Sequence, residues 1–136
     1  MSARVRYLLD TNIASHIAKD TIPMATRQFT RVRTETVAIS IISEAELLFG
    51  LAKMPEARVL ASAIRVFLSK ISILPWDSNA ARHYAHLRAA LRRAGSALGA
   101  MDMLIAAQAI TIDAILVTSD VAFRRIDQLK TEDWTI

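Results

Sequence analysis

The sequence predicts a single α/β domain in which short parallel strands alternate with helices. The first supporting observation is length, because 136 residues suit one domain and leave no room for a second full core. The second is that apolar, β-branched runs alternate with stretches of helical periodicity. The third is that no repeat or linker interrupts the chain, which contains only 3 Gly and 3 Pro. We therefore expect residues 1–136 to form one domain.

Four runs are predicted to be buried strands. Each is short, rich in apolar or β-branched residues, and bounded by polar or turn residues, which is typical of a parallel strand covered on both faces. The runs are residues 5–9, 37–41, 71–74 and 114–117.

Three stretches are predicted to be helices. In residues 56–68 and 78–94 the apolar side chains recur three or four positions apart, which places them on one helical face. Residues 103–109 form a third predicted helix, and Asp102 stands at its start. The alternation of these helices with the strands indicates an α/β sandwich.

The composition excludes several kinds of site and suggests a kind of partner. Cysteine is absent, which excludes disulfides, thiolate metal sites and a cysteine nucleophile, and suits the reducing cytoplasm. No apolar stretch approaches the roughly 20 residues of a membrane span, so we expect a soluble, cytoplasmic protein. The formal charge of +4 is compatible with a polyanionic partner. Since 53% of the residues are apolar, a homodimer interface or a partner protein would cover surplus apolar surface.

Four acidic residues stand where strands end or helices begin. Asp10 ends the first predicted strand, and Glu46 is expected in the first helical turn after the second. Asp102 opens a predicted helix, and Asp120 follows the last predicted strand. Because the carboxyl ends of parallel strands share one edge of a sheet, these four side chains are predicted to converge there.

Each acid alone also has a purely structural interpretation. Acidic residues suit helix starts, and Ser43-x-x-Glu46 matches a capping box in which Glu46 would bond back to the Ser43 backbone. Together, however, four carboxylates in one cleft would repel one another unless a cation compensated them. An all-oxygen ligand set selects Mg²⁺ or Mn²⁺ rather than Zn²⁺, and these ions suit phosphodiester hydrolysis.

The acidic segments, in their order along the chain, resemble those of the PIN-domain nucleases, and of the VapC toxins in particular. The resemblance implies a three-layer α/β/α sandwich around a parallel sheet. It also implies Mg²⁺- or Mn²⁺-dependent endoribonuclease activity on transfer or ribosomal RNA, which inhibits translation and growth, and a VapB-type antitoxin that occupies the acidic pocket. The segments are Leu8-Leu9-Asp10-Thr11-Asn12, Ala45-Glu46-Leu47-Leu48-Phe49-Gly50, Asp102-x-x-Ile105-Ala106 and Val117-Thr118-Ser119-Asp120.

The resemblance assigns Asp10, Glu46, Asp102 and Asp120 as the catalytic metal ligands. Glu44 lies two positions before Glu46 and so about 200° away around a helix, and only one of the two can face the site. The Glu-Leu-x-x-Gly pattern of the family selects Glu46. Nearby polar residues are candidates to orient ligands or water, or else ordinary caps and turn residues, and these are Asn12, Thr118 and Ser119.

Two groups of arginines are candidates to bind the phosphates that flank the cleaved bond. They are predicted to lie near the rim of the cleft, where they would offset the repulsion of RNA by the acids; a solvated face is the alternative. Arg88, Arg92 and Arg93 precede the loop that leads to Asp102, and Arg124 and Arg125 follow Asp120.

Two other classes of protein also gather acids at strand ends. A receiver-type signalling domain does so, but it needs an acidic pair at the first strand, whereas Asp10 is followed by Thr11 and Asn12. No Lys ends a late predicted strand, as a phosphoryl-binding receiver would require. A non-catalytic RNA- or protein-binding module of the same fold is the second alternative.

Overall fold

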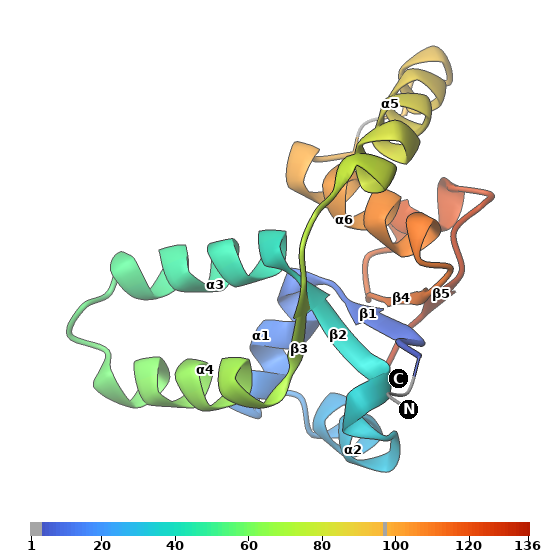
Figure 1. The fold of residues 1–136 in the computed structure, drawn as a ribbon. Helices are drawn as coiled ribbons and strands as arrows, with labels where there is room; N and C mark the ends of the chain where they lie inside the picture. Colours follow the sequence, from blue (N-terminus) through green and yellow to red (C-terminus); the bar gives the residue numbers. More distant parts are fainter. Residues whose placement is uncertain (1–3, 97) are drawn as a thin grey trace.

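A five-stranded parallel sheet forms the centre of the protein in the computed structural model, which describes residues 4–96 and 98–136 (Figure 1). The strand order is β3-β2-β1-β4-β5, and every neighbouring pair is parallel. The first four strands lie within the four predicted runs, whereas the fifth was not predicted. The strands are β1 (Tyr7–Leu9), β2 (Val37–Ser40), β3 (Ser72–Leu74), β4 (Ile115–Val117) and β5 (Thr131–Glu132).

Helices connect the strands, and three of them confirm the predicted ones with shifted ends. In the part of the chain that the structure describes, no helix is both long and apolar enough to cross a membrane. The helices are α1 (Thr11–Lys19), α2 (Pro23–Arg31), α3 (Ile41–Ala52), α4 (Arg58–Lys70), α5 (Ser78–Arg93) and α6 (Ala100–Thr111), with short 3₁₀ turns η1 (Thr34–Thr36) and η2 (Val121–Arg125).

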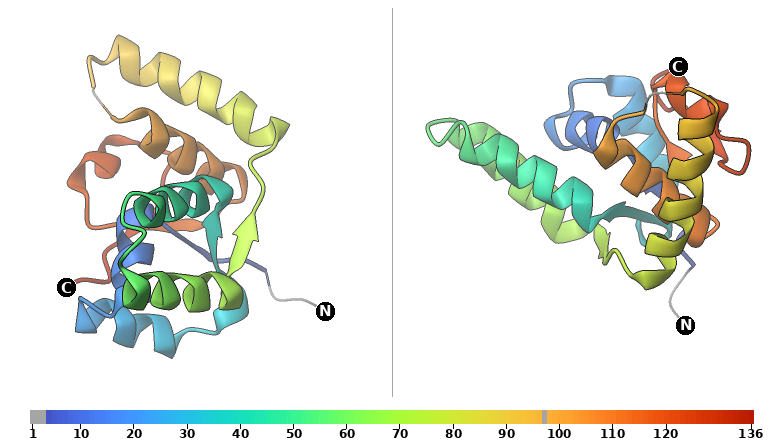
Figure 2. Two further views of the ribbon diagram at one scale, coloured as in Figure 1. Left: turned by 90° about the vertical axis from the view of Figure 1, so that its left-hand side faces the viewer. Right: turned by 90° about the horizontal axis from the view of Figure 1, so that it is seen from above.

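The sheet is covered on both faces, which confirms the three-layer α/β/α architecture (Figure 2). Successive strand residues point to opposite faces. Leu8 of β1 therefore packs with the buried side chains of α5 and α6, whereas Leu9 packs with those of α1 and α4. Because both faces are buried, the strands consist of nearly continuous apolar residues, and this is the signal that made them predictable.

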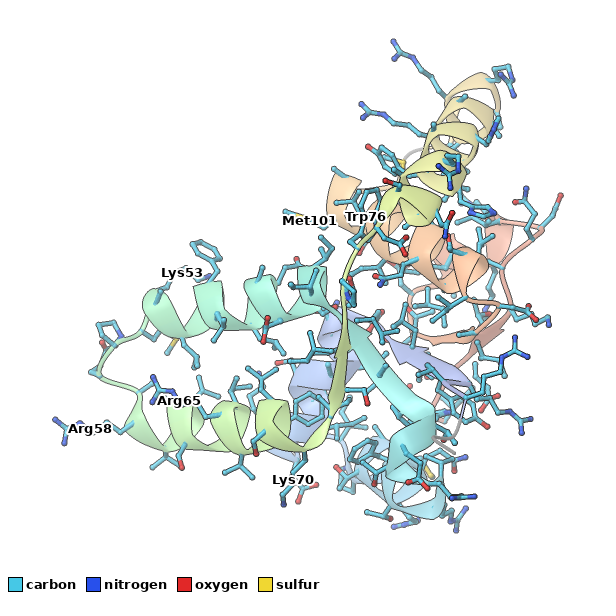
Figure 3. The ribbon with its side chains drawn as sticks, in the orientation of Figure 1. Lys53, Arg58, Arg65, Lys70, Trp76 and Met101 are labelled. Atoms are coloured by element: carbon cyan, nitrogen blue, oxygen red, sulfur yellow. The ribbon has the colours of Figure 1, made fainter. Side chains whose placement is uncertain are left out.

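Helices α3 and α4 form an antiparallel pair that extends away from the sheet, and we call this pair the arm (Figures 1 and 2). Several apolar side chains on it are exposed, including Phe49 at 63% and Val59 at 87%. Cationic side chains also lie along the arm, and Figure 3 labels Lys53, Arg58, Arg65 and Lys70. The arm thus presents an exposed surface that is both apolar and basic.

Candidate active site

Two neighbouring strands each deliver a carboxylate to the same edge of the sheet. Asp10 follows β1 directly, is only 5% exposed, and caps α1 by accepting the Ile13 backbone N–H on Oδ1 at 2.8 Å. Asp120 follows β4 after two residues and caps η2 by accepting the Ala122 backbone N–H at 2.9 Å. Because β1 and β4 pair in parallel, both caps stand at the carboxyl ends of adjacent strands.

Two helices supply the other predicted carboxylates, with local positions that differ from the prediction. Asp102 is half-buried in the first turn of α6, but the helix begins at Ala100 rather than at Asp102. Glu46 lies in the second turn of α3, because that helix begins at Ile41 after the cap Ser40. The prediction that Glu46 lies in the first helical turn is therefore wrong, and the alternative interpretation of Ser43 and Glu46 as a capping box is excluded, because Ser40 is the cap.

The charges of the four carboxylates act on one another. Burial raises the pKa of Asp10, the Thr118 hydroxyl and the Ile13 N–H lower it, and the charges of Asp102 and Asp120 raise it further. Burial also raises the pKa of Asp102, and the charges of Asp120 and Glu46 add to this increase. The fold thus brings together acids that lie far apart in the sequence, at an energetic cost that a cation would reduce.

The donor chemistry of this cluster fits a hard divalent cation. Only carboxylate oxygens of Asp and Glu take part, and Mg²⁺ and Mn²⁺ prefer such ligands. Among residues 4–96 and 98–136, no three His, Asp or Glu side chains already form a group that could hold a metal ion. The carboxylates therefore interact electrostatically, but they do not form a complete set of metal ligands.

The polar residues predicted to orient ligands occupy different environments. Thr118 is buried, and its Oγ1 accepts the Asp120 backbone N–H at 3.1 Å while the hydroxyl also acts on Asp10. Thr118 therefore connects the carboxylate of Asp10 to the backbone of Asp120. Ser119 is exposed, and Asn12 is exposed at the wall of a cavity that Glu46 also lines.

This cavity has a volume of about 250 Å³ and lies between α1, α3 and α4. Thr11, Asn12 and Glu46 line one part of it, and Leu60 and Ile64 of α4 line another. Lys19 and Lys53 contribute cationic groups to the wall. The candidate site is therefore continuous with a recess between α1 and the arm.

Sequence reasoning missed Thr11 and Ser43. The Thr11 hydroxyl donates to Glu46 Oε1 at 2.6 Å, and it lies 2.9 Å from the Ser43 hydroxyl. The three-residue spacing between Ser43 and Glu46 was the available signal, because it also places two side chains on one helical face. The same spacing also matches a capping box, so the sequence alone did not distinguish the two.

The arginines predicted to bind phosphate are exposed at the ends of two elements. Arg124 and Arg125 end η2, the turn that Asp120 caps. Arg92 and Arg93 lie in the last turn of α5, whose C-terminal end points away from the sheet (Figure 1).

Arg88 lies within α5 and contacts an aromatic side chain. Its guanidinium donates to the Tyr84 hydroxyl at 2.8 Å and lies 5.9 Å from the centre of that ring. Tyr84 in turn packs edge-on against Trp76, whose indole N–H donates to the Leu104 carbonyl of α6 (Figure 3). These contacts join α5 to the helix that carries Asp102.

Comparison with known proteins adds independent observations. Residues 7–129 match the PIN domain family. The chain is 34% identical over 134 residues to a Shigella flexneri protein named tRNA(fMet)-specific endonuclease VapC, covering 96% of this chain and 99% of that protein. It is 35% identical over 130 residues to ribonuclease VapC2 of Rickettsia felis, covering 94% and 97% of the two chains.

A solved structure supports the same comparison. The crystal structure of DNA-bound VapBC from Salmonella typhimurium contains a chain that matches this fold with a TM-score of 0.88 at 30% sequence identity. The match covers 96% of this chain and 98% of that one.

Proposed function

Because the chain belongs to the PIN-domain family and, within it, to the VapC ribonucleases, we propose that it hydrolyses RNA with a divalent metal ion held by carboxylates. As a member of this family it is an endoribonuclease of the toxin–antitoxin class. We propose that residues 1–136 form one PIN-like domain and that it acts in the cytoplasm, where its RNA substrates are. Transfer or ribosomal RNA is the proposed target, since the Shigella relative is named for a transfer RNA.

The observation that carries the metal proposal is the mutual repulsion within the acidic cluster. Asp10 feels the charges of Asp102 and Asp120, and Asp102 feels those of Asp120 and Glu46. Asp10 and Asp120 each cap a helical element, but capping alone does not require that four acids come together, and their mutual repulsion disfavours it. Their convergence supports a site that binds Mg²⁺ or Mn²⁺.

The proposed roles follow from how each side chain is held. Asp10, Glu46, Asp102 and Asp120 would hold the metal, and Asp10 is the most firmly oriented because Ile13 and Thr118 both bond to it. When bound, Mg²⁺ or Mn²⁺ polarises a phosphoryl oxygen and lowers the pKa of a bound water. Asn12, Thr118 and Ser119 would orient these ligands or the water.

The arginines would attract the RNA phosphates, which an acidic site repels. Flexible cationic side chains can pair with phosphates on either side of the cleaved bond without neutralising the carboxylates themselves. The residues assigned this role are Arg88, Arg92, Arg93, Arg124 and Arg125.

The proposed protein partners are a VapB-type antitoxin and, within the toxin–antitoxin complex, a second copy of this chain. A cleft of about 420 Å³ between α3 and α4 supports the first partner, since Leu48 and Met54 provide apolar lining and Arg58 and Arg65 provide charge. Such a cleft suits an amphipathic helix that carries acidic residues beside its apolar face.

Cleavage of RNA by the purified chain with Mn²⁺ tests the proposed function. Asp102→Asn should abolish cutting while the fold is retained. Asp113→Asn should not, because Asp113 is exposed and pairs with Arg4 and Lys130 at 3.4 Å. RNA binding by the wild type without any cutting would favour the non-catalytic alternative. Coexpression with the neighbouring small reading frame should also yield a complex with suppressed activity.

A further inference from the structure

Two hydroxyl groups connect α1 to α3 beside the acidic cluster. Thr11 begins α1 directly after Asp10, and its Oγ1 donates to Glu46 Oε1 at 2.6 Å. The same Oγ1 lies 2.9 Å from Ser43 Oγ. Ser43 is completely buried and Thr11 is half-buried, so this contact is shielded from solvent on its Ser43 side.

The hydrogen bonds in this group have a defined direction. A threonine hydroxyl carries one proton, and Thr11 donates it to Glu46. Ser43 must therefore be the donor in its own bond to Thr11. The result is a chain of hydrogen bonds from Ser43 through Thr11 to Glu46, in which Glu46 Oε1 is the final acceptor.

The final bond of this chain is short. Hydrogen bonds from a hydroxyl to an oxygen acceptor are about 2.5 to 3.0 Å long. The 2.6 Å distance from Thr11 Oγ1 to Glu46 Oε1 lies at the short end of this range. The bond therefore fixes one of the two carboxylate oxygens of Glu46.

The geometry also explains why Glu46 rather than Glu44 faces the site. Ser43 and Glu46 are three positions apart on α3 and lie on the same face of the helix, toward Thr11. The charge of Glu46 reaches Asp102, where it helps to raise the pKa. Thr11 thus holds Glu46 between the start of α1 and the carboxylate of α6.

We propose that Thr11 and Ser43 are positioning residues of the nuclease, which hold the Glu46 carboxylate oriented toward the metal. This inference rests on the proposed function, because Glu46 needs an orientation toward metal only if the cluster binds one. Thr11 acts on Glu46 directly by donating to it. Ser43 acts through Thr11, because it donates to the Thr11 oxygen and so leaves the Thr11 proton directed at Glu46. Simple packing between α1 and α3 is the competing explanation.

Manganese affinity, measured on the purified chain by electron paramagnetic resonance, separates the two explanations. Thr11→Val keeps the shape of the side chain but removes the hydroxyl, and should weaken Mn²⁺ binding about tenfold. Thr11→Ser keeps the hydroxyl and should restore binding to within about twofold. Ser43→Ala should have an intermediate effect of about threefold, because Thr11 can still donate to Glu46. Thr30→Val is the matched control, since that exposed hydroxyl donates to the Arg27 carbonyl of its own helix.

A double-mutant cycle with Glu46→Gln tests whether Thr11 acts through Glu46. The double variant should bind Mn²⁺ no more weakly than Glu46→Gln alone, whereas independent effects would add. Cleavage at saturating RNA should follow the same pattern, with kcat reduced by Thr11→Val and KM for RNA unchanged.

The results that overturn the inference differ from those that overturn the proposed function. Wild-type Mn²⁺ affinity in Thr11→Val, or equal impairment in Thr11→Ser and Thr11→Val, would refute the positioning role while leaving metal-dependent cleavage intact. Absence of Mn²⁺ binding and of cleavage in the wild type would refute the proposed function itself. If Thr11→Val does not fold, Ser43→Ala with unchanged Mn²⁺ affinity would still refute the inference.

Discussion

Asp10 Oδ1 accepts the backbone N–H of Ile13 at 2.8 Å, so the most deeply buried acid of the cluster is also the cap of α1. One side chain therefore has both a structural and a proposed functional role. These roles can be separated, because an amide oxygen can cap a helix as well as a carboxylate can. Asparagine at this position keeps the cap and removes the charge.

We expect Asp10→Asn to abolish RNA cleavage without loss of stability. Asp10→Ala should abolish cleavage and also lower the free energy of unfolding by about 1 kcal/mol, because the Ile13 N–H loses its acceptor. Urea unfolding in EDTA measures the stability difference, and a ribonuclease assay with Mn²⁺ measures the activity. An Asp10→Asn variant that cuts RNA at the wild-type rate would contradict the assignment of Asp10 as a metal ligand.

The raised pKa values of Asp10 and Asp102 predict how the stability of the metal-free protein depends on pH. Both groups hold their protons in the folded state to higher pH than the unfolded value of 3.8. The folded state then binds more protons than the unfolded state, so the free energy of unfolding decreases as pH rises from about 4 through the raised pKa values.

Comparison of the wild type with variants separates the contribution of Asp10 and Asp102 from that of the other acids. Melting temperatures in EDTA between about pH 4 and pH 7 should decrease less in Asp10→Asn and Asp102→Asn than in the wild type. Added Mn²⁺ should raise the melting temperature of the wild type most at the upper end of this range, where the carboxylates are ionised. If melting temperature depends on pH in the same way in the wild type and the variants, protonation of the two acids is not coupled to folding.

Glu46 and Glu44 form a natural pair for substitution. Glu46→Gln should lower cleavage by about 100-fold or more, because the charge near Asp102 and the acceptor of Thr11 are both changed. Glu44→Gln should leave cleavage within about twofold, since that side chain points about 200° away around α3. Equal losses in the two variants would show that the family pattern was carried over to the wrong residue.

Charge reversal of Arg92 and Arg93 tests the proposed RNA contacts. Together, the substitutions to Glu should weaken RNA binding at low salt and reduce the salt dependence of the dissociation constant. Fluorescence anisotropy with labelled RNA measures both quantities, and an inactive Asp102→Asn background prevents cleavage. Arg31→Glu on α2 is the control. Unchanged RNA affinity of the variant with both Arg92 and Arg93 replaced would contradict the proposed role of these two residues.

The cleft on the arm predicts which substitutions release the antitoxin. Leu48→Glu should place a charge in the apolar lining of that cleft and reduce copurification of the small partner. RNA cleavage by the isolated chain should be retained, because Leu48 does not line the cavity beside Glu46. Val66→Glu is the control, because Val66 is 49% exposed and does not line this cleft. Equal recovery of the partner with both variants would place the antitoxin elsewhere.

Most of the sheet was predictable because burial on both faces leaves a direct signal in the sequence. The run around Leu8 and Leu9 is apolar throughout, and the acid that follows it marks the end of the strand. The same logic anticipated that Asp10 and Asp120 would meet. By contrast, β5 contains only Thr131 and Glu132, which join the sheet by pairing with β4 rather than through an apolar pattern.

The contacts that orient the acidic side chains depend on how the helices pack against one another. A single sequence does not give the distances between helices. Thr11 and Glu46 are 35 positions apart and meet only because α1 and α3 pack together. The start of α3 was also misplaced, because Ile41 continues the apolar run of β2 although it already belongs to the helix. Ser40 marks the true boundary, since its hydroxyl accepts the Ile42 N–H.

The order of the strands determines how local opening affects the chemistry. β3 and β5 are the outer strands of the sheet, whereas β1 and β4, which precede Asp10 and Asp120, each have a neighbour on both sides. The margins can therefore fray while β1 and β4 keep their amide protons protected from exchange with solvent. The backbone that carries Asp10 and Asp120 thus lies away from the strands at which the sheet opens first.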